Sequence, residues 1–494
     1  MPGSLRRSAS LPPSQQLGEI LLPEAGGGAQ SPDRLAPVLA RRPGGVGLGP
    51  VDHQLAPHAG EPGDRGGATC ASNSSKAESM GPPAPIGAIR QGQGEADGPR
   101  AVRALAGGMT KRARGSGAAV AAALALTAAI GGPAVAGAPP RRTIGSAILF
   151  WSQAAHDRAF PHMERVFRGS VVRRGGRVHP LPPGRPLPIA SDVVDRFVRR
   201  QHVAGLLVLR DGRVRLERYG RGLRPRGRWT SFSIAKSVTA LLVGAAIRDG
   251  AIRSVDDLVT IYLPQLAASA YQGVTVAQLL TMTSGVRWNE DYTDPASDVA
   301  RLYTSPVASG TDPTLAYMRR LPRVAPPGTT WAYKTGETDL VGVLVSTVTR
   351  RHLAAYLSDR IWRPYGMARD AFWMTDRSGH EAGGCCLSMT LRDYGRLGQL
   401  VLDDGAGLMP KGWIASATAA HVAIDDAGDG YGYQWWTLPG HRVAAIGIFG
   451  QSMLIDPEHR VVIVMLGTWP KPVDAALSRE RAAFQQRLIE AATR

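Results

Sequence analysis

The chain has 494 residues, with 58 Lys and Arg against 40 Asp and Glu and a formal net charge of +18. The length exceeds one small domain, and the charge raises the question of nucleic acid or an anionic surface as a partner. The arginines are scattered in short pairs such as Arg173-Arg174 and Arg199-Arg200, without a recognition motif. The sequence therefore argues against nucleic-acid binding and favours electrostatic association with an anionic cell envelope.

The first 138 residues differ in composition from the rest. Residues 1–108 are rich in Gly, Pro, Ser, Ala and Arg, and we interpret them as disordered or as an untranslated upstream extension. Met109 is followed by basic residues, an apolar run at 118–130 and small residues at Ala-x-Ala spacing. This pattern is typical of a secretory signal peptide at 109–138, and its apolar run is too short to span a bilayer. We therefore expect a periplasmic or secreted protein that starts at Met109.

The exported part alternates strand and helix patterns in chain order. Two β-rich runs at 204–209 and 214–219 flank Asp211-Gly212, which predicts a hairpin. Helical patterns follow at residues 238–247, 275–282, 315–321, 339–348 and 353–361. Strands are predicted at residues 430–438, 443–449, 452–455 and 460–466, with a turn at 456–459 and an amphipathic helix at 473–492.

These elements predict an α/β (α+β) fold, with an antiparallel sheet flanked by helices and a mostly helical second domain. We place the first part of the α/β domain at 139–255, a helical insert domain at 256–380 and the second part of the α/β domain at 381–494. No internal repeat is visible.

A serine stands three residues before a lysine at Ser233 and Lys236, at the start of an apolar helix. Residues at this spacing share one helix face, and a serine in the first turn lies at the positive end of the helix dipole. A partly buried lysine there can lose its proton near neutral pH and act as a base. Residues 141–494 contain only four lysines, so a generic surface charge is less expected. The alternative is that Ser233 only caps the helix and Lys236 is solvated.

Metal and disulfide chemistry find little support in the sequence. Cys385 and Cys386 are adjacent, and we expect them to be buried small residues rather than a disulfide or metal ligands. His-Glu-x-x-His, Cys-x-x-Cys and clustered carboxylates are absent, and so is the Gly-x-Ser-x-Gly of a nucleophile elbow. We therefore predict no metal and no cofactor.

Three further segments carry a resemblance. Residues 281–286 read Thr-Met-Thr-Ser-Gly-Val, residues 331–336 read Trp-Ala-Tyr-Lys-Thr-Gly, and residues 447–451 read Gly-Ile-Phe-Gly-Gln. With Ser233-x-x-Lys236 they resemble the motifs of the serine β-lactamase and penicillin-recognising superfamily, in its class C-like and esterase branch. The likeness covers residues 145–490 and is strongest to 6-aminohexanoate-dimer hydrolase-type enzymes.

The resemblance implies catalytic roles. Ser233 would be the acylated nucleophile, with Lys236 and Tyr333 passing its proton and the Lys236 ammonium lowering the pKa of Tyr333. Backbone N–H groups of Ser233 and Gln451 would bind the oxyanion.

The resemblance also implies four substrate-binding residues, of which two depart from the family pattern. Tyr292 would close over the substrate amide, and Gly450 would lie on the strand that borders the substrate. Thr335 replaces the usual asparagine, and Ile448 stands where a basic residue would pair with an antibiotic carboxylate.

Both departures favour a linear amide or ester over a β-lactam. We predict an exported serine hydrolase that cleaves a small-molecule amide or ester through a Ser233 acyl-enzyme. A β-lactamase or D-Ala-D-Ala carboxypeptidase is the alternative within the fold, and a catalytically silent envelope-binding module is the alternative outside enzymes. The sequence assigns no oligomeric state.

Overall fold

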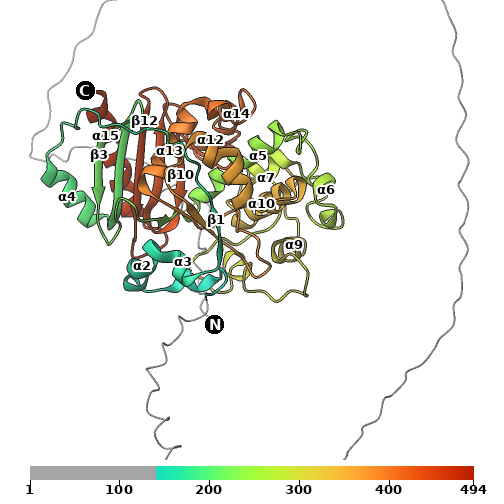
Figure 1. The fold of residues 1–494 in the computed structure, drawn as a ribbon. Coiled ribbons are helices and arrows are strands. Elements are labelled where there is room, and N and C mark those ends of the chain that lie inside the picture. Colours follow the sequence, from blue (N-terminus) through green and yellow to red (C-terminus); the bar gives the residue numbers. More distant parts are fainter. Residues whose placement is uncertain (1–140) are drawn as a thin grey trace, which may run out of the picture. The chain divides into compact units, whose positions relative to one another are not determined.

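A computed structural model describes residues 141–494 (Figure 1). The expectations for the extension at 1–108 and for the signal peptide at 109–138 lie outside these described residues. Among residues 141–494, no helix combines the length and the apolar composition needed to cross a bilayer.

The larger sheet has eight antiparallel strands in the order β3-β2-β12-β11-β10-β9-β8-β7. The strands are β2 (Val203–Arg210), β3 (Arg213–Tyr219), β7 (Val422–Ala423), β8 (Gly430–Tyr431), β9 (Trp436–Leu438), β10 (Arg442–Gly447), β11 (Gln451–Asp456) and β12 (Val461–Gly467). The hairpin around Asp211-Gly212 and the turn at 456–459 are confirmed. The strand predicted at 430–438 is instead two short strands, because Gln434 between them takes a positive φ of 64°.

Helices cover both faces of this sheet. Along β2, Leu206 and Val208 belong to one apolar cluster, while Leu207 and Leu209 belong to the other. This alternation means that the strand is buried on both sides. The cluster with Leu206 includes α4 (Ser191–Arg200) and α15 (Ala475–Thr493), whose Phe197 and Phe484 rings stack with centroids 3.7 Å apart.

On the other face, α13 (Leu391–Leu402) lies close to the strands because it carries two glycines where it meets them. A Cβ at Gly395 would lie 2.6 Å from a methyl group of Leu207, and a Cβ at Gly398 would lie 2.4 Å from one of Val462. Any side chain at these positions would push the helix off the sheet.

A smaller antiparallel sheet in the order β1-β5-β6-β4 leads into the region of Ser233. Its strands are β1 (Gly169–Val172), β4 (Trp229–Thr230), β5 (Ala371–Met374) and β6 (Leu387–Met389). Just after β4, the Ser231 N–H donates to Leu387 O at 3.0 Å, and the Ser231 hydroxyl accepts from Leu387 N–H at 3.0 Å. This double contact fixes the chain before it enters α5 (Ile234–Arg248).

The stretch predicted as a helical insert is helical as far as Tyr365 and then enters β5. Its helices are α6 (Val259–Tyr262), η3 (Pro264–Leu266), α7 (Val276–Leu280), α8 (Asp298–Arg301), α9 (Pro313–Met318), α10 (Thr335–Thr349), α11 (Leu353–Leu357), η4 (Ser358–Trp362) and α12 (Arg363–Tyr365). The remaining helices are η1 (Ser146–Phe150), α2 (Gln153–Ala159), η2 (Phe160–His162), α3 (Met163–Val166), η5 (Asp404–Gly407), α14 (Trp413–Ala417) and η6 (Ile448–Gly450).

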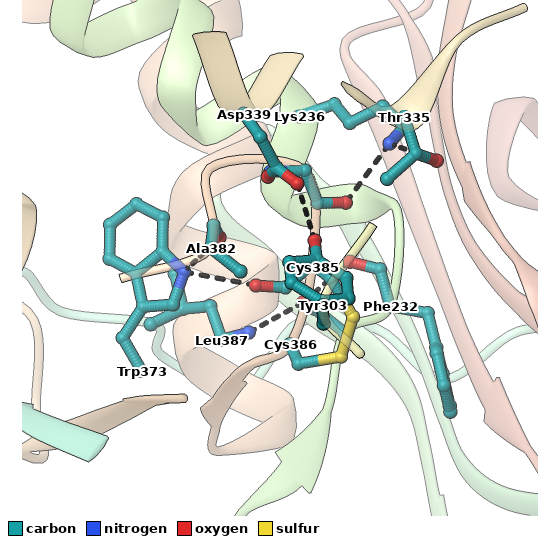
Figure 2. The surroundings of a disulfide bond; sticks show 12 residues. Phe232, Lys236, Tyr303, Thr335, Asp339, Trp373, Ala382, Cys385, Cys386 and Leu387 are labelled. Carbon is teal, nitrogen blue, oxygen red and sulfur yellow. Dashed lines mark hydrogen bonds between the residues drawn. A yellow bond between two sulfur atoms is a disulfide. The ribbon is translucent and has the colours of Figure 1, made fainter. Parts of the chain in front are cut away.

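The expectation for the two cysteines is wrong. Cys385 and Cys386, in the loop between β5 and β6, form a vicinal disulfide (Figure 2). The expectation rested on the strain that a bridge between adjacent cysteines imposes on an ordinary backbone. Cys386 has a φ of 71°, so the backbone at the pair is not an ordinary one.

Candidate active site

Ser233 lies at a turn that packing holds in an unusual conformation. Phe232, directly before it, has a φ of 43° and is buried. Its ring lies 5.1 Å from that of Phe160 and 5.3 Å from that of Phe449, measured between centroids. Ser233 occupies the N-cap position of α5, yet its hydroxyl makes no capping hydrogen bond. The reading of Ser233 as a simple helix cap is therefore wrong, and its hydroxyl borders a hollow instead.

Lys236 follows one turn later and is 1% exposed, so it is not a solvated surface charge. Its Nζ donates to Thr335 Oγ1 at 2.9 Å and to Gly384 O at 3.1 Å, and Figure 2 shows it beside Thr335. Burial lowers the pKa of Lys236 to about 8, against the opposing pull of the Glu290 and Asp339 carboxylates. The neutral amine is therefore far more populated at neutral pH than it would be in an exposed lysine.

Tyr333 lies between Lys236 and the sheet. The Lys236 Nζ stands 5.2 Å from the centroid of the Tyr333 ring, and that ring also contacts Trp436, stacked at 5.7 Å, and Tyr431, edge-on at 6.2 Å. Burial, helped by the Glu290 charge, raises the pKa of Tyr333 well above its usual range, and a hydrogen bond with Ser233 only partly offsets this. The expected lowering of the Tyr333 pKa is therefore wrong, because burial outweighs the neighbouring lysine. The phenol stays protonated, and Lys236 is the more available base.

Glu290 is a site residue that the sequence did not reveal. Its buried carboxylate accepts hydrogen bonds from the Thr335 N–H at 2.9 Å and the Tyr292 hydroxyl at 2.8 Å, and also from the Thr335 hydroxyl and the Trp288 indole. The Thr335 hydroxyl, which accepts from Lys236 and donates to Glu290, therefore links Lys236 to a buried negative charge. A glutamate in a polar loop has no periodic signal, and only its place two residues before Tyr292 hinted at a role.

The structure brings Tyr292 and Ile448 to the nucleophile but not Gln451 or Gly450. Two hollows adjoin Ser233, and among the described residues both linings include Tyr292 and Ile448, while neither includes Gln451 or Gly450. Gln451 is fully buried, and its amide donates to Phe449 O at 3.0 Å and Gly467 O at 2.8 Å. A Cβ at Gly450 would lie 2.6 Å from the indole nitrogen of Trp469.

The strand residue next to Ser233 is Gly447. A Cβ there would lie 2.6 Å from Ser231 O and 3.1 Å from Ser233 N, so the strand end at Gly447 and Ile448 borders the nucleophile. The left-handed Phe449, with a φ of 61°, breaks the strand between β10 and β11. Counting along the motif therefore could not tell which residue faces the site.

One group in the described residues has the composition of a metal site, although no such cluster is apparent in the sequence. Asp312, Asp376 and His380 offer ligand atoms within 4.8 Å of one another. Asp312 already accepts hydrogen bonds from Leu315 N–H at 2.9 Å and His380 Nδ1 at 2.8 Å. Asp376 accepts from the N–H groups of Ser378 and His380 at 2.8 and 3.1 Å. These hydrogen bonds give the three residues a structural role, because they join the start of α9 to the turn at residues 376–380.

The fold and this arrangement of Ser233, Lys236 and Tyr333 define a penicillin-recognising type of serine hydrolase. Residues 190–487 match the family described as Beta-lactamase, and the chain belongs to this family. It is 32% identical over 345 residues to the 6-aminohexanoate-dimer hydrolase of Paenarthrobacter ureafaciens, which covers 65% of this chain and 88% of that protein. The chain is a hydrolase of the β-lactamase-related family, as predicted.

Solved structures agree on the fold. A Bacillus anthracis protein provisionally described as a 6-aminohexanoate-dimer hydrolase superposes with a TM-score of 0.60 at 22% identity, over 68% of this chain and 93% of that one. A penicillin binding protein from Bacillus halodurans gives 0.50 at 17% identity, over 60% of this chain and 99% of that one. The β-lactamase/transpeptidase-like fold predicted from the sequence is thus confirmed.

Proposed function

We propose that the chain is an exported serine hydrolase that cleaves an amide or ester bond of a linear small molecule through an acyl-enzyme on Ser233. The observation that carries the proposal is the buried Lys236 amine. It is held by neutral oxygens of Thr335 and Gly384, one helical turn from a serine whose hydroxyl does not cap its helix. A neutral amine so placed can remove a proton from the serine at ordinary pH.

In the first step Lys236 takes the Ser233 proton while the serine oxygen attacks the substrate carbonyl carbon. The Ser233 N–H binds the oxyanion, and we place the second donor at the Gly447–Ile448 strand end instead of at Gln451. The protonated lysine then returns a proton through the neutral Tyr333 hydroxyl to the leaving amine or alkoxide. Collapse of the intermediate breaks the C–N or C–O bond, and water later releases the acyl group by the same route.

The hollow beside Ser233 that Trp436 and Trp469 line has walls that favour a linear substrate. They are mainly apolar and aromatic, with Trp436, Trp469, Ile446 and Ile448 around Ser233. Ile448 offers no charge to the carboxylate of a bicyclic antibiotic, which argues against β-lactam hydrolysis. A relative named for cleaving the 6-aminohexanoate dimer, a linear amide, makes this class of substrate the first to test.

The nucleophile is tested by intact-mass spectrometry after treatment with a fluorophosphonate probe. We expect one adduct on the wild-type protein, none on Ser233→Ala and slower labelling of Lys236→Ala. An unlabelled wild-type protein, or an adduct that persists in Ser233→Ala, contradicts the acyl-enzyme.

The substrate class is tested with p-nitrophenyl esters, the 6-aminohexanoate dimer and nitrocefin. Faster turnover of nitrocefin than of the linear substrates would favour the β-lactamase alternative. Export is tested separately by peptide mass spectrometry of the native protein. We expect a mature N-terminus near residues 136–139, and peptides from residues 1–108 would contradict it.

A further inference from the structure

Arg481 is a buried arginine on α15. It is 3% exposed, although arginine is among the residues least often buried without a partner. Its guanidinium carbon lies 4.9 Å from the ring centroid of Trp469, which covers one face of the charged group. A cation–π contact of this kind leaves the N–H edge of the guanidinium free to bind an anion.

Within residues 141–494, Arg481 has neither an ion pair nor a hydrogen bond. The neighbouring acid on the helix, Glu480, is paired with Arg200 and accepts from the Gln201 amide at 2.9 Å. Burial lowers the pKa of Arg481 to about 10, and no nearby carboxylate opposes this shift. The guanidinium is nevertheless charged at neutral pH, and a buried charge of this kind is stable only with an anion beside it.

The place of Arg481 indicates where that anion comes from. Arg481 lines the same hollow as Ser233, and the buried Ser478, one turn earlier on the same helix face, lines it too. The rest of the wall is apolar, with Trp436, Ile446 and Ile448 among its residues. A molecule in the hollow thus meets the nucleophile, an apolar surface and an unpaired guanidinium.

We propose that Arg481, assisted by the Ser478 hydroxyl, binds a carboxylate at one end of the substrate. This inference rests on the proposed function and narrows its substrate class. The class is a linear amide or ester with a free acid group, separated from the scissile carbonyl by an apolar chain. Arg481 takes the anion-binding role that Ile448 cannot fill on the strand.

The test compares two probes that share the acyl chain and leaving group, the acid p-nitrophenyl hydrogen adipate and its uncharged methyl ester p-nitrophenyl methyl adipate. Arg481→Met should lower kcat/KM for the acid by about 30-fold or more, as for the loss of one partner of a buried charge pair. For the methyl ester it should leave kcat/KM nearly unchanged. Arg481→Lys should keep part of the preference for the acid, and Arg487→Met, an exposed arginine on the same helix, should change neither probe.

Two kinetic results overturn the proposal. An equal loss for acid and methyl ester means that Arg481 only supports the fold, and an unchanged preference means that it binds no carboxylate. Circular dichroism and thermal unfolding of each variant identify a loss that comes from misfolding.

Ligand binding to a variant that cannot form the acyl-enzyme tests the carboxylate site independently of catalysis. Calorimetric titration of Ser233→Ala with hexanoate and with hexanamide should show tighter binding of hexanoate, and adding Arg481→Met should abolish the difference. This result supports the carboxylate site even when the wild-type protein hydrolyses neither ester. No preference for hexanoate overturns the site, whatever the fluorophosphonate experiment gives.

Discussion

Two lysines of this chain, Lys236 and Lys334, are equally buried, each 1% exposed, but their surroundings differ. Lys334 lies 3.7 Å from the Glu337 carboxylate and donates to Met282 O at 3.1 Å. Lys236 is held by a hydroxyl and a carbonyl and, among the described residues, forms no ion pair. The carboxylates of Glu290 and Asp339 act on it only from farther away.

The difference separates a structural lysine from a chemical one. A directly paired carboxylate stabilises the ammonium form and makes the lysine part of the fold. Neutral oxygens hold the amine in place but stabilise its charged form less than a carboxylate does. Burial can therefore lower the pKa of the amine. Of the two, only Lys236 has surroundings suited to a base.

Removing each lysine should therefore have opposite consequences. Lys236→Met should lower kcat by about 10³-fold, within the range for loss of a general base, with little change in stability. The measurement is kcat on a p-nitrophenyl ester together with the urea unfolding midpoint. A kcat within a few-fold of wild type would remove Lys236 from the mechanism.

Lys334→Met should instead destabilise the protein by about 3–5 kcal/mol, because it leaves the Glu337 carboxylate buried without its partner. The molecules that remain folded should keep most of their activity. Urea denaturation gives the free energy, and the Lys334→Met/Glu337→Gln double variant should recover part of it. A loss of kcat with unchanged stability would contradict the structural role of Lys334.

The pH dependence of the wild-type enzyme reports on Lys236 directly. The active form carries the neutral amine, and burial lowers the Lys236 pKa to about 8. Rate therefore increases as the proton is lost: kcat/KM should rise about tenfold per pH unit below pH 8 and level off above it. A profile that is flat between pH 6 and 9 would contradict this assignment.

Replacing Glu290 by Gln tests how the surroundings of Lys236 set its pKa. We expect a smaller effect than from the loss of Lys236 itself. The Glu290 charge raises the pKa of Lys236, so its removal should move the midpoint of the pH profile to lower pH. The plateau rate should also fall, because Thr335 and Tyr292 lose a carboxylate acceptor. Asp312→Asn, a carboxylate that pairs with His380, should leave the midpoint in place.

Local patterns carried the successful predictions. The hairpin around Asp211-Gly212 follows from alternating side chains and a turn, and the burial of Lys236 one helical turn after Ser233 follows from an apolar helix that begins at this pair. These relations span few residues, so the chain itself displays them. Tyr292 and Ile448 came from resemblance, and the structure brings both to the hollows beside Ser233.

The missed features depend on contacts that tertiary structure creates. Glu290 joins the site through Thr335, 45 residues away, and no periodicity marks such a pair. Arg481 looks like any other arginine of a basic helix until the fold buries it beside Trp469. Gln451 was wrongly placed at the oxyanion site. A single left-handed residue, Phe449, changes which residues of the following strand face Ser233. The Tyr333 pKa was misjudged because burial, which the sequence does not display, dominates it.

The strand order has a consequence for synthesis of the protein. Strand β2 lies between its hairpin partner β3 and β12, so its second edge pairs only with Val461–Gly467. During synthesis Ser233 leaves the ribosome well before β12. The sheet beside it cannot be completed until the C-terminal strands have been made. Ser478 and Arg481 of the last helix, α15, also line the hollow beside Ser233. We therefore expect a polypeptide truncated before β12 and α15 to lack hydrolytic activity.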